Sequence, residues 1–224
     1  MKNKQEKILV ISPHADDETL GAGGTLLKYK DEGESIFWLN ITDIKKEYGY
    51  EEEQERVRAK ELESVKKKYG FSATYNLGLE PAGLDKYPKS HLIEEISKIV
   101  NEIQPNTVIL PYGKDVHTDH KLVFECAYPC TKSFRYPFVK KVLAMEIISE
   151  TDFAIAEEGF VPNYFVDITN FVDKKNEIML MYESELGTPP FPRSVENITS
   201  LARVRGSTAG VEYAEAFKLL KWVD

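Results

Sequence analysis

The chain has 224 residues, of which 42% are hydrophobic and 29% charged, and its formal net charge is −8. This balance predicts one globular domain over 1–224 with a substantial core. The negative charge argues against nucleic acid as a partner, because binding it normally requires a basic surface. The opening MKNKQEK lacks the apolar segment of a secretory signal, and no apolar run is long enough for membrane insertion. We therefore expect a cytoplasmic protein, with homo-oligomer formation left open.

Strands and helices alternate through the first half of the sequence. Apolar residues at helical spacing over 90–103, ended by Pro105, give the clearest helix. The expected strands are 7–13, 35–42, 73–79 and 107–113, and the expected helices are 19–32, 53–69 and 90–103. This order predicts an α/β fold with a mostly parallel, Rossmann-like sheet in a three-layer α/β/α sandwich.

The second half continues with two strands and then a helical end. We expect strands over 139–148 and 163–169, followed by helices over 170–186, 194–205 and 211–221. Cys126 and Cys130 lie four apart on an expected helix, and we interpret them as packing thiols.

Glycines follow the first strand, as they do in dinucleotide-binding folds. Gly21, Gly23 and Gly24 do not have the G-x-G-x-x-G spacing, because Leu26 occupies the third position. The acids before them would also repel a diphosphate. We expect instead that the glycines form a tight turn beneath a cation site.

Histidines and acids follow two strands of the expected sheet. The segment PHADDE (13–18) ends the first strand, and HTDH (117–120) follows the fourth. The carboxyl ends of parallel strands lie at one edge of a sheet, where ligands bind. The fourth histidine, His91, begins a surface helix and is expected to be incidental.

Two imidazoles and a carboxylate with an open position form a common catalytic zinc site. His14, Asp17 and His120 could supply these ligands, which leaves Asp16 free to accept a proton from water. A purely structural alternative is that Asp16, Asp17 or Asp119 caps the helix that follows it. Capping explains one acid and does not explain two histidine–acid clusters.

These two motifs resemble those of the LmbE-like, or PIG-L, family of zinc-dependent N-deacetylases. Supporting stretches are TLGAGGTL behind the first motif, RVRAKELESVKKKYG (56–70), FVDIT (165–169) and the tail 193–220. The similarity extends over nearly the whole chain. Ala15 and Thr118 depart from the commonest family form, which has proline at both positions.

The resemblance implies a role for each motif residue. His14, Asp17 and His120 would bind one Zn²⁺, with Fe²⁺ or another divalent ion also possible, and Asp16 would be the general base. His117 would stabilise the oxyanion, and Asp119 would lie behind His117 and favour its charged form. Some relatives add a tyrosine to the oxyanion site, for which Tyr112 is a distant candidate.

The implied substrate is an N-acetylated amino sugar of the N-acetylglucosamine type. Arginines early in the second helix or near the C-terminus would bind an anionic part of it, and the candidates are Arg56, Arg58, Arg193, Arg203 and Arg205. Other interpretations are another metal-dependent hydrolytic or hydratase reaction on this fold, or a sugar-binding protein without catalysis. A non-haem iron oxygenase has similar ligands, but the alternating strand–helix order disfavours it.

Overall fold

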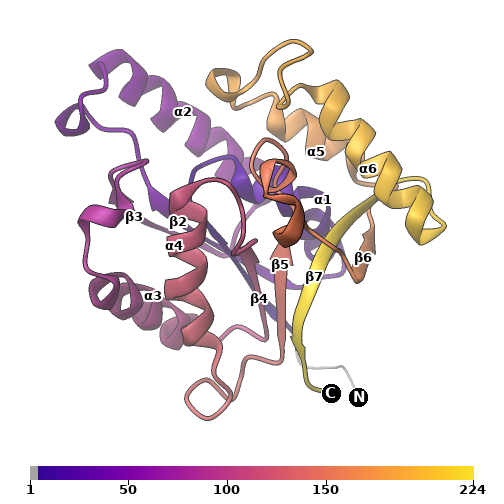
Figure 1. Ribbon diagram of the computed structural model, residues 1–224, viewed down its shortest axis with the longest axis horizontal. Coiled ribbons are helices and arrows are strands. Elements are labelled where there is room, and N and C mark those ends of the chain that lie inside the picture. Colours follow the sequence, from indigo (N-terminus) through magenta and orange to yellow (C-terminus); the bar gives the residue numbers. More distant parts are fainter. Residues whose placement is uncertain (1–4) are drawn as a thin grey trace.

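The computed structural model describes residues 5–224 and contains a seven-stranded sheet of order β3-β2-β1-β4-β5-β7-β6 (Figure 1). The parallel strands are β1 (Lys7–Ser12), β2 (Ser35–Thr42), β3 (Ala73–Leu79), β4 (Thr107–Pro111) and β5 (Lys141–Met145). Strand β7 (Ala214–Trp222) is antiparallel to β5 and to β6 (Tyr164–Asp167). The mostly parallel sheet confirms the predicted fold class.

Helices cover both faces of this sheet (Figure 1). Ile8 and Val10 of β1 pack toward one face, whereas Leu9 and Ile11 pack toward the other. The first face carries α1 (Asp17–Asp31), α2 (Glu52–Tyr69), α5 (Val172–Met179) and α6 (Val195–Ala209), and the second carries α3 (Lys89–Ile103) and α4 (Thr118–Ala127). Burial on both faces explains why the strand sequences are almost continuously apolar.

The C-terminal segment differs from the sequence prediction. The helix expected over 211–221 is wrong, because these residues contribute most of strand β7. Ala, Glu, Lys and Leu favour helices, but this segment pairs with β5 and β6, and tertiary pairing overrides local propensity. The helix expected over 170–186 is also too long, since α5 ends at Met179.

The three glycines after the first motif lie inside α1 and not in a turn, which corrects the sequence prediction. A Cβ atom on Gly24 would lie 2.7 Å from Ile168, and one on Gly21 would lie 2.8 Å from Met145. Glycine is therefore required because α1 packs closely against the strands and loop beneath it.

A buried ion pair contacts the backbone in the middle of α1. Lys175 Nζ lies 2.7 Å from Glu215 Oε1, and both side chains are only 4% exposed. Glu215 accepts hydrogen bonds from the backbone N–H groups of Gly24 and Thr25, at 2.8 and 2.7 Å. Lys175 donates to the Leu20 carbonyl, the usual helical acceptor for Gly24, at 2.9 Å. The pair thus joins α1, α5 and β7.

No helix within residues 5–224 is long and apolar enough to cross a bilayer. The prediction about a secretory signal rests partly on residues 1–4, which lie outside the described residues.

Replacing Lys175 should destabilise the fold. Lys175→Met leaves the Glu215 carboxylate buried without its cation, which typically costs about 3–5 kcal/mol. Urea unfolding should show this loss, while the neighbouring exposed substitution Lys174→Met should change the free energy of unfolding by less than about 0.5 kcal/mol. Equal stabilities of the two variants would contradict the assigned role of the pair.

Both cysteines should resist modification in the folded protein. Cys126 and Cys130 are free and no more than 1% exposed, and burial raises the pKa of Cys126 to about 11. Because the thiolate is the reactive form, iodoacetamide at pH 8 should label neither residue before unfolding and both after it. Mass spectrometry reports the count, and labelling of the native protein would show that this packing opens readily.

Candidate active site

The two acid–histidine motifs meet where the strand order of the sheet reverses. Strand β1 lies between β2 and β4, so the chain builds outward to β3 and then returns to β4 on the other side of β1. The connections after β1 and β4 lead to helices on opposite faces of the sheet, and their first residues face each other at a topological switch point, where open α/β sheets bind ligands. Pro13 ends β1, and Thr42 of β2 holds the Pro13 carbonyl through both its backbone N–H and its hydroxyl.

Three side-chain atoms from these loops converge. His120 Nε2 lies 3.3 Å from His14 Nδ1 and 3.4 Å from Asp17 Oδ2, and the His14 Nδ1–Asp17 Oδ2 distance is 3.5 Å. Tetrahedral zinc with bonds of about 2.0–2.1 Å places its ligand atoms roughly 3.3 Å apart. The spacing of these three atoms thus fits a mononuclear metal centre.

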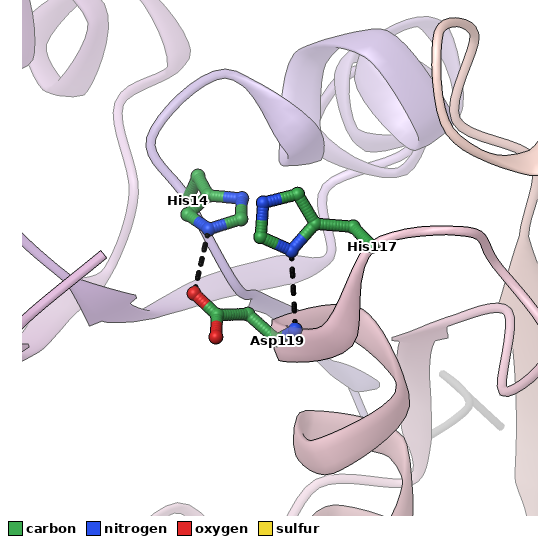
Figure 2. A group of neighbouring side chains, drawn as sticks. All are labelled: His14, His117 and Asp119. Carbon is green, nitrogen blue, oxygen red and sulfur yellow. Dashed lines mark hydrogen bonds and ion pairs between the residues drawn. The ribbon is translucent and has the colours of Figure 1, made fainter. Parts of the chain in front are cut away.

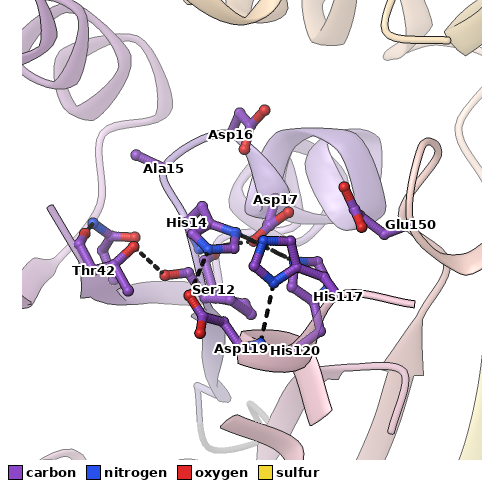
Figure 3. A network of polar contacts seen from close by, with 12 residues as sticks. Ser12, His14, Ala15, Asp16, Asp17, Thr42, His117, Asp119, His120 and Glu150 are labelled. Carbon is purple, nitrogen blue, oxygen red and sulfur yellow. Dashed lines mark hydrogen bonds and ion pairs between the residues drawn. The ribbon is translucent and has the colours of Figure 1, made fainter. Parts of the chain in front are cut away.

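A carboxylate contacts the far side of each imidazole, and Figure 3 shows that of Asp119 against His14. Asp119 Oδ2 lies 3.1 Å from His14 Nε2, and Asp115 Oδ2 lies 2.8 Å from His120 Nδ1. Carboxylate partners of this kind orient histidine ligands and fix which nitrogen faces the metal. Asp115 was missed by the sequence analysis, although its position just before α4 and five residues ahead of His120 was a usable signal.

The placement of Asp119 differs from the sequence expectation (Figure 2). Its carboxylate contacts His14, whereas His117 receives a hydrogen bond from the Asp119 backbone N–H to Nδ1, at 3.1 Å. His117 is thereby the N-cap of α4. An imidazole nitrogen that accepts a hydrogen bond is deprotonated, which leaves the His117 proton on Nε2.

His14, His117 and Asp119 form a second cluster with metal-ligand spacing. Its donor atoms already have partners, however. Asp119 accepts the backbone N–H groups of Ala82 and Leu84, at 2.7 and 3.3 Å, and His117 Nδ1 accepts that of Asp119. In the cluster of His14, Asp17 and His120, Asp17 Oδ2 accepts the backbone N–H of His14 at 2.8 Å, and the other contacts are among the three donor atoms themselves.

The electrostatics of this cluster favour a positive charge. Burial opposes a charge on His120, but Asp17 and Asp115 outweigh it and raise its pKa to about 10. Burial is likewise outweighed at His14, where Asp119 and Asp17 raise the pKa to about 9. Burial and the neighbouring histidines lower the pKa of His117 to about 4. The buried acids therefore require compensating protons or a cation, while His117 stays neutral.

Asp16 is buried beside this cluster but points away from Asp17 (Figure 3). Its backbone has φ 139°, a region that costs energy for any residue except glycine, and strain of this kind is common at functional sites. Its side chain does not cap α1, and Oδ2 has no hydrogen-bond partner. Burial and the charge of Asp17 raise the pKa of Asp16 well above its usual range. The capping alternative for Asp16 is therefore wrong.

A pocket of about 480 Å³ opens above these residues. It is lined by Arg58 and Arg193, and also by residues that the sequence analysis missed, namely Asp43, Tyr50, Glu53, Glu150, Ser184 and Glu185. These residues come from loops and helices with no shared sequence motif, so no sequence signal identified them. Tyr112 lies elsewhere and donates its hydroxyl to the Glu158 carbonyl.

The arginine candidates occupy different environments. Arg58 is 7% exposed and donates to the Ala15 carbonyl at 3.1 Å, which ties α2 to the first motif. Arg193 Nη1 lies 3.9 Å from Asp16 Oδ2. The remaining three lie outside the pocket lining and pair with other residues: Arg56 with Glu53, Arg203 with Glu212, and Arg205 with Glu146.

Comparison with known proteins identifies relatives of the whole chain. The sequence model of the family described as "PIG-L: GlcNAc-PI de-N-acetylase" matches residues 9–131. Diacetylchitobiose deacetylase of Thermococcus kodakarensis is 24% identical over 97% of this chain and 84% of its own length. A probable N-acetyl-alpha-D-glucosaminyl L-malate deacetylase 2 of Bacillus anthracis is 25% identical over 96% of this chain and 94% of its own length.

Two solved structures show the same fold. The conserved protein TT1542 from Thermus thermophilus superposes with a TM-score of 0.79 and 27% identity, covering 98% of this chain and 97% of that protein. The 4-carboxy-2-hydroxymuconate hydratase GalB of Pseudomonas putida gives a TM-score of 0.77 at 16% identity, covering 98% of both chains. At 16% identity this second likeness shows the fold alone.

Proposed function

This chain belongs to the PIG-L family of de-N-acetylases and is an enzyme that acts on a C–N bond, and we propose that it removes the acetyl group from an N-acetylated amino-sugar conjugate. One observation carries the proposal: His14, Asp17 and His120 converge in a pocket beside the Asp16 carboxylate, whose Oδ2 accepts no hydrogen bond. Measurement of acetate release from N-acetylglucosamine conjugates in the presence of Zn²⁺ tests it directly.

His14 Nδ1, Asp17 Oδ2 and His120 Nε2 are the proposed ligands of one Zn²⁺ per chain, and Fe²⁺ or another divalent ion would suit the same donors. When bound there, such a cation polarises the acetamide carbonyl and acidifies the attacking water. Asp115 and Asp119 hold the two imidazoles in the required orientation.

Asp16 is the proposed general base. Its free oxygen accepts the proton of the water whose oxygen attacks the carbonyl carbon. Asp16 then donates this proton to the leaving nitrogen as the C–N bond breaks, and the products are acetate and an amine. The strained backbone at Asp16 directs its carboxylate away from Asp17, so the two adjacent acids can have different roles.

His117 is the proposed hydrogen-bond donor to the developing oxyanion. Because its Nδ1 accepts the Asp119 N–H, its Nε2–H is available at the pocket. A neutral imidazole can donate in this way, and a preorganised donor of this type typically contributes about 3–4 kcal/mol to the transition state.

The relatives suggest the class of substrate. Both deacetylases named above act, by their names, on N-acetylglucosamine units, one in a disaccharide and one joined to malate. An N-acetylglucosamine-type conjugate is therefore the proposed small-molecule partner of this protein.

Loss of a proposed ligand should remove the metal. Zinc-loaded protein should contain about one zinc per chain. His14→Ala, Asp17→Ala or His120→Ala should each lose most of it by elemental analysis, since each removes one donor of the cluster. His91→Ala is the matched control, because His91 lies exposed on α3. Full metal content in all three ligand variants would refute this site.

Substitution of the two adjacent acids should have different effects. Asp16→Asn retains the shape of the side chain but cannot accept a proton at neutral pH, and loss of a general base typically costs on the order of 10²–10⁴ in rate. Asp16→Asn should therefore retain zinc and release acetate at least about a hundredfold more slowly. Asp17→Asn should weaken metal binding, and added zinc should partly restore its activity.

Metal content and acetate release, measured for both variants over several zinc concentrations, separate the two roles. If Asp16→Asn lost its zinc while Asp17→Asn kept it, the assigned roles would be exchanged. Full activity of Asp16→Asn would eliminate Asp16 as the base.

A further inference from the structure

Carboxylates line the proposed substrate pocket on several sides. Asp43 follows β2, Glu53 lies in the first turn of α2, Glu150 follows β5, and Glu185 lies in a short turn after α5. The four positions belong to separate elements, so their negative charges face one volume from different directions. The pocket volume of about 480 Å³ is in the usual range for ligand sites.

Asp43 and Glu150 are the acids of this lining that lack a compensating cation. Within residues 5–224, neither has a basic side chain at ion-pairing distance, whereas Glu53 pairs with Arg56 and Glu185 with Arg58 and Arg193. Asp43 accepts a hydrogen bond from Asn76 at 2.7 Å, and Glu150 contacts the Ser149 hydroxyl at 3.4 Å. Figure 3 shows the Glu150 carboxylate on the same side of the centre as His117.

The two arginines of the lining do not supply a free positive charge. The Arg58 guanidinium contacts Glu61, Glu185, Ser184 and the Ala15 carbonyl. Arg193 lies between two acids: it is 3.3 Å from Glu185 Oε2 and 3.9 Å from Asp16 Oδ2, and its Nε donates to the Glu185 carbonyl.

An independent feature marks this volume as a ligand site. Asp16 is 3% exposed, its Oδ2 has no hydrogen-bond partner, and the residue lines the pocket. A buried polar atom without a partner is rare, and a ligand is one way to satisfy it. The four lining acids therefore surround a volume suited to a bound ligand.

We propose that this pocket selects conjugates in which the group attached to the N-acetylated sugar is uncharged, and that Asp43 and Glu150 set this preference by repelling carboxylate and phosphate groups. The inference rests on the proposed deacetylase function and specifies its substrate class. Sugar hydroxyls can donate hydrogen bonds to these carboxylates, whereas an anion placed beside Asp43 and Glu150 is repelled by both, because Arg58 and Arg193 in the same lining are already paired with acids. Juxtaposed like charges at a recognition site act mainly on specificity.

The first test compares three substrates of the zinc-loaded enzyme: N,N'-diacetylchitobiose, N-acetylglucosaminyl malate and N-acetylglucosamine 6-phosphate. The value of kcat/KM for the uncharged disaccharide should exceed that for either anion by about tenfold or more. A preference for an anionic conjugate, or equal values, would overturn the inference while leaving the deacetylase function intact. Absence of acetate from all three would overturn the proposed function itself.

The second test removes the charges. Asp43→Asn/Glu150→Gln should reduce the preference for the disaccharide about fivefold or more, mainly by improving KM for the anions. The matched control Asp31→Asn/Glu94→Gln removes the same charge from positions outside the pocket lining and should leave the ratio unchanged. An unchanged ratio in the first variant, or an equal change in both, would overturn the role of Asp43 and Glu150.

Ionic strength provides a measurement that does not depend on any variant. Raising the salt concentration screens the repulsion, so kcat/KM of the wild-type enzyme for the anions should rise relative to that for the disaccharide. A fall in this relative value would show that the pocket attracts anions and would overturn the inference.

Discussion

The parallel pairing of β1 with β4 is the constraint on which the site depends. Ile8, Leu9 and Val10 lie beside Thr107, Val108 and Ile109, and this register brings the loops after the two strands together. Residues about 100 positions apart in the sequence then lie 3.1–3.3 Å apart, as His14 does from Asp119 and His120. Any change in this register would move one motif away from the other and leave its acids buried without partners.

The N-termini of α1 and α4, together with the neighbouring histidines, explain why buried acids are tolerated at this site. Asp17 lies in the first turn of α1 and Asp119 in the first turn of α4, where the partial positive charge of the helix dipole favours carboxylates. Histidines satisfy the same acids from the other side. The Lys175–Glu215 pair holds the middle of α1, and Gly21 and Gly24 pack closely against Met145 and Ile168. The N-terminus of α1 therefore has little freedom to move.

The arginines show that the role of a side chain depends on its position in the fold. Sequence alone made Arg58 and Arg205 equivalent candidates for binding an anion. In the structure Arg58 supports the loop of the first motif, whereas Arg205 pairs with Glu146 beside a separate cavity. Ion pairing among the lining side chains therefore sets the local charge of the pocket. The pocket is acidic near Asp43 and Glu150, although Arg58 and Arg193 also line it.

The sequence by itself determined the alternating order of the first half, the identity of the two motifs and their location at strand ends. These features depend on local patterns, namely continuous apolar strands, helical spacing and adjacent acids and histidines. Tertiary structure alone decided that 214–222 is a strand, that the glycines serve packing, that Asp119 supports His14, and that Glu150 lies in the pocket. Each of these depends on contacts between segments far apart in the chain, and local propensity carries no information about such contacts.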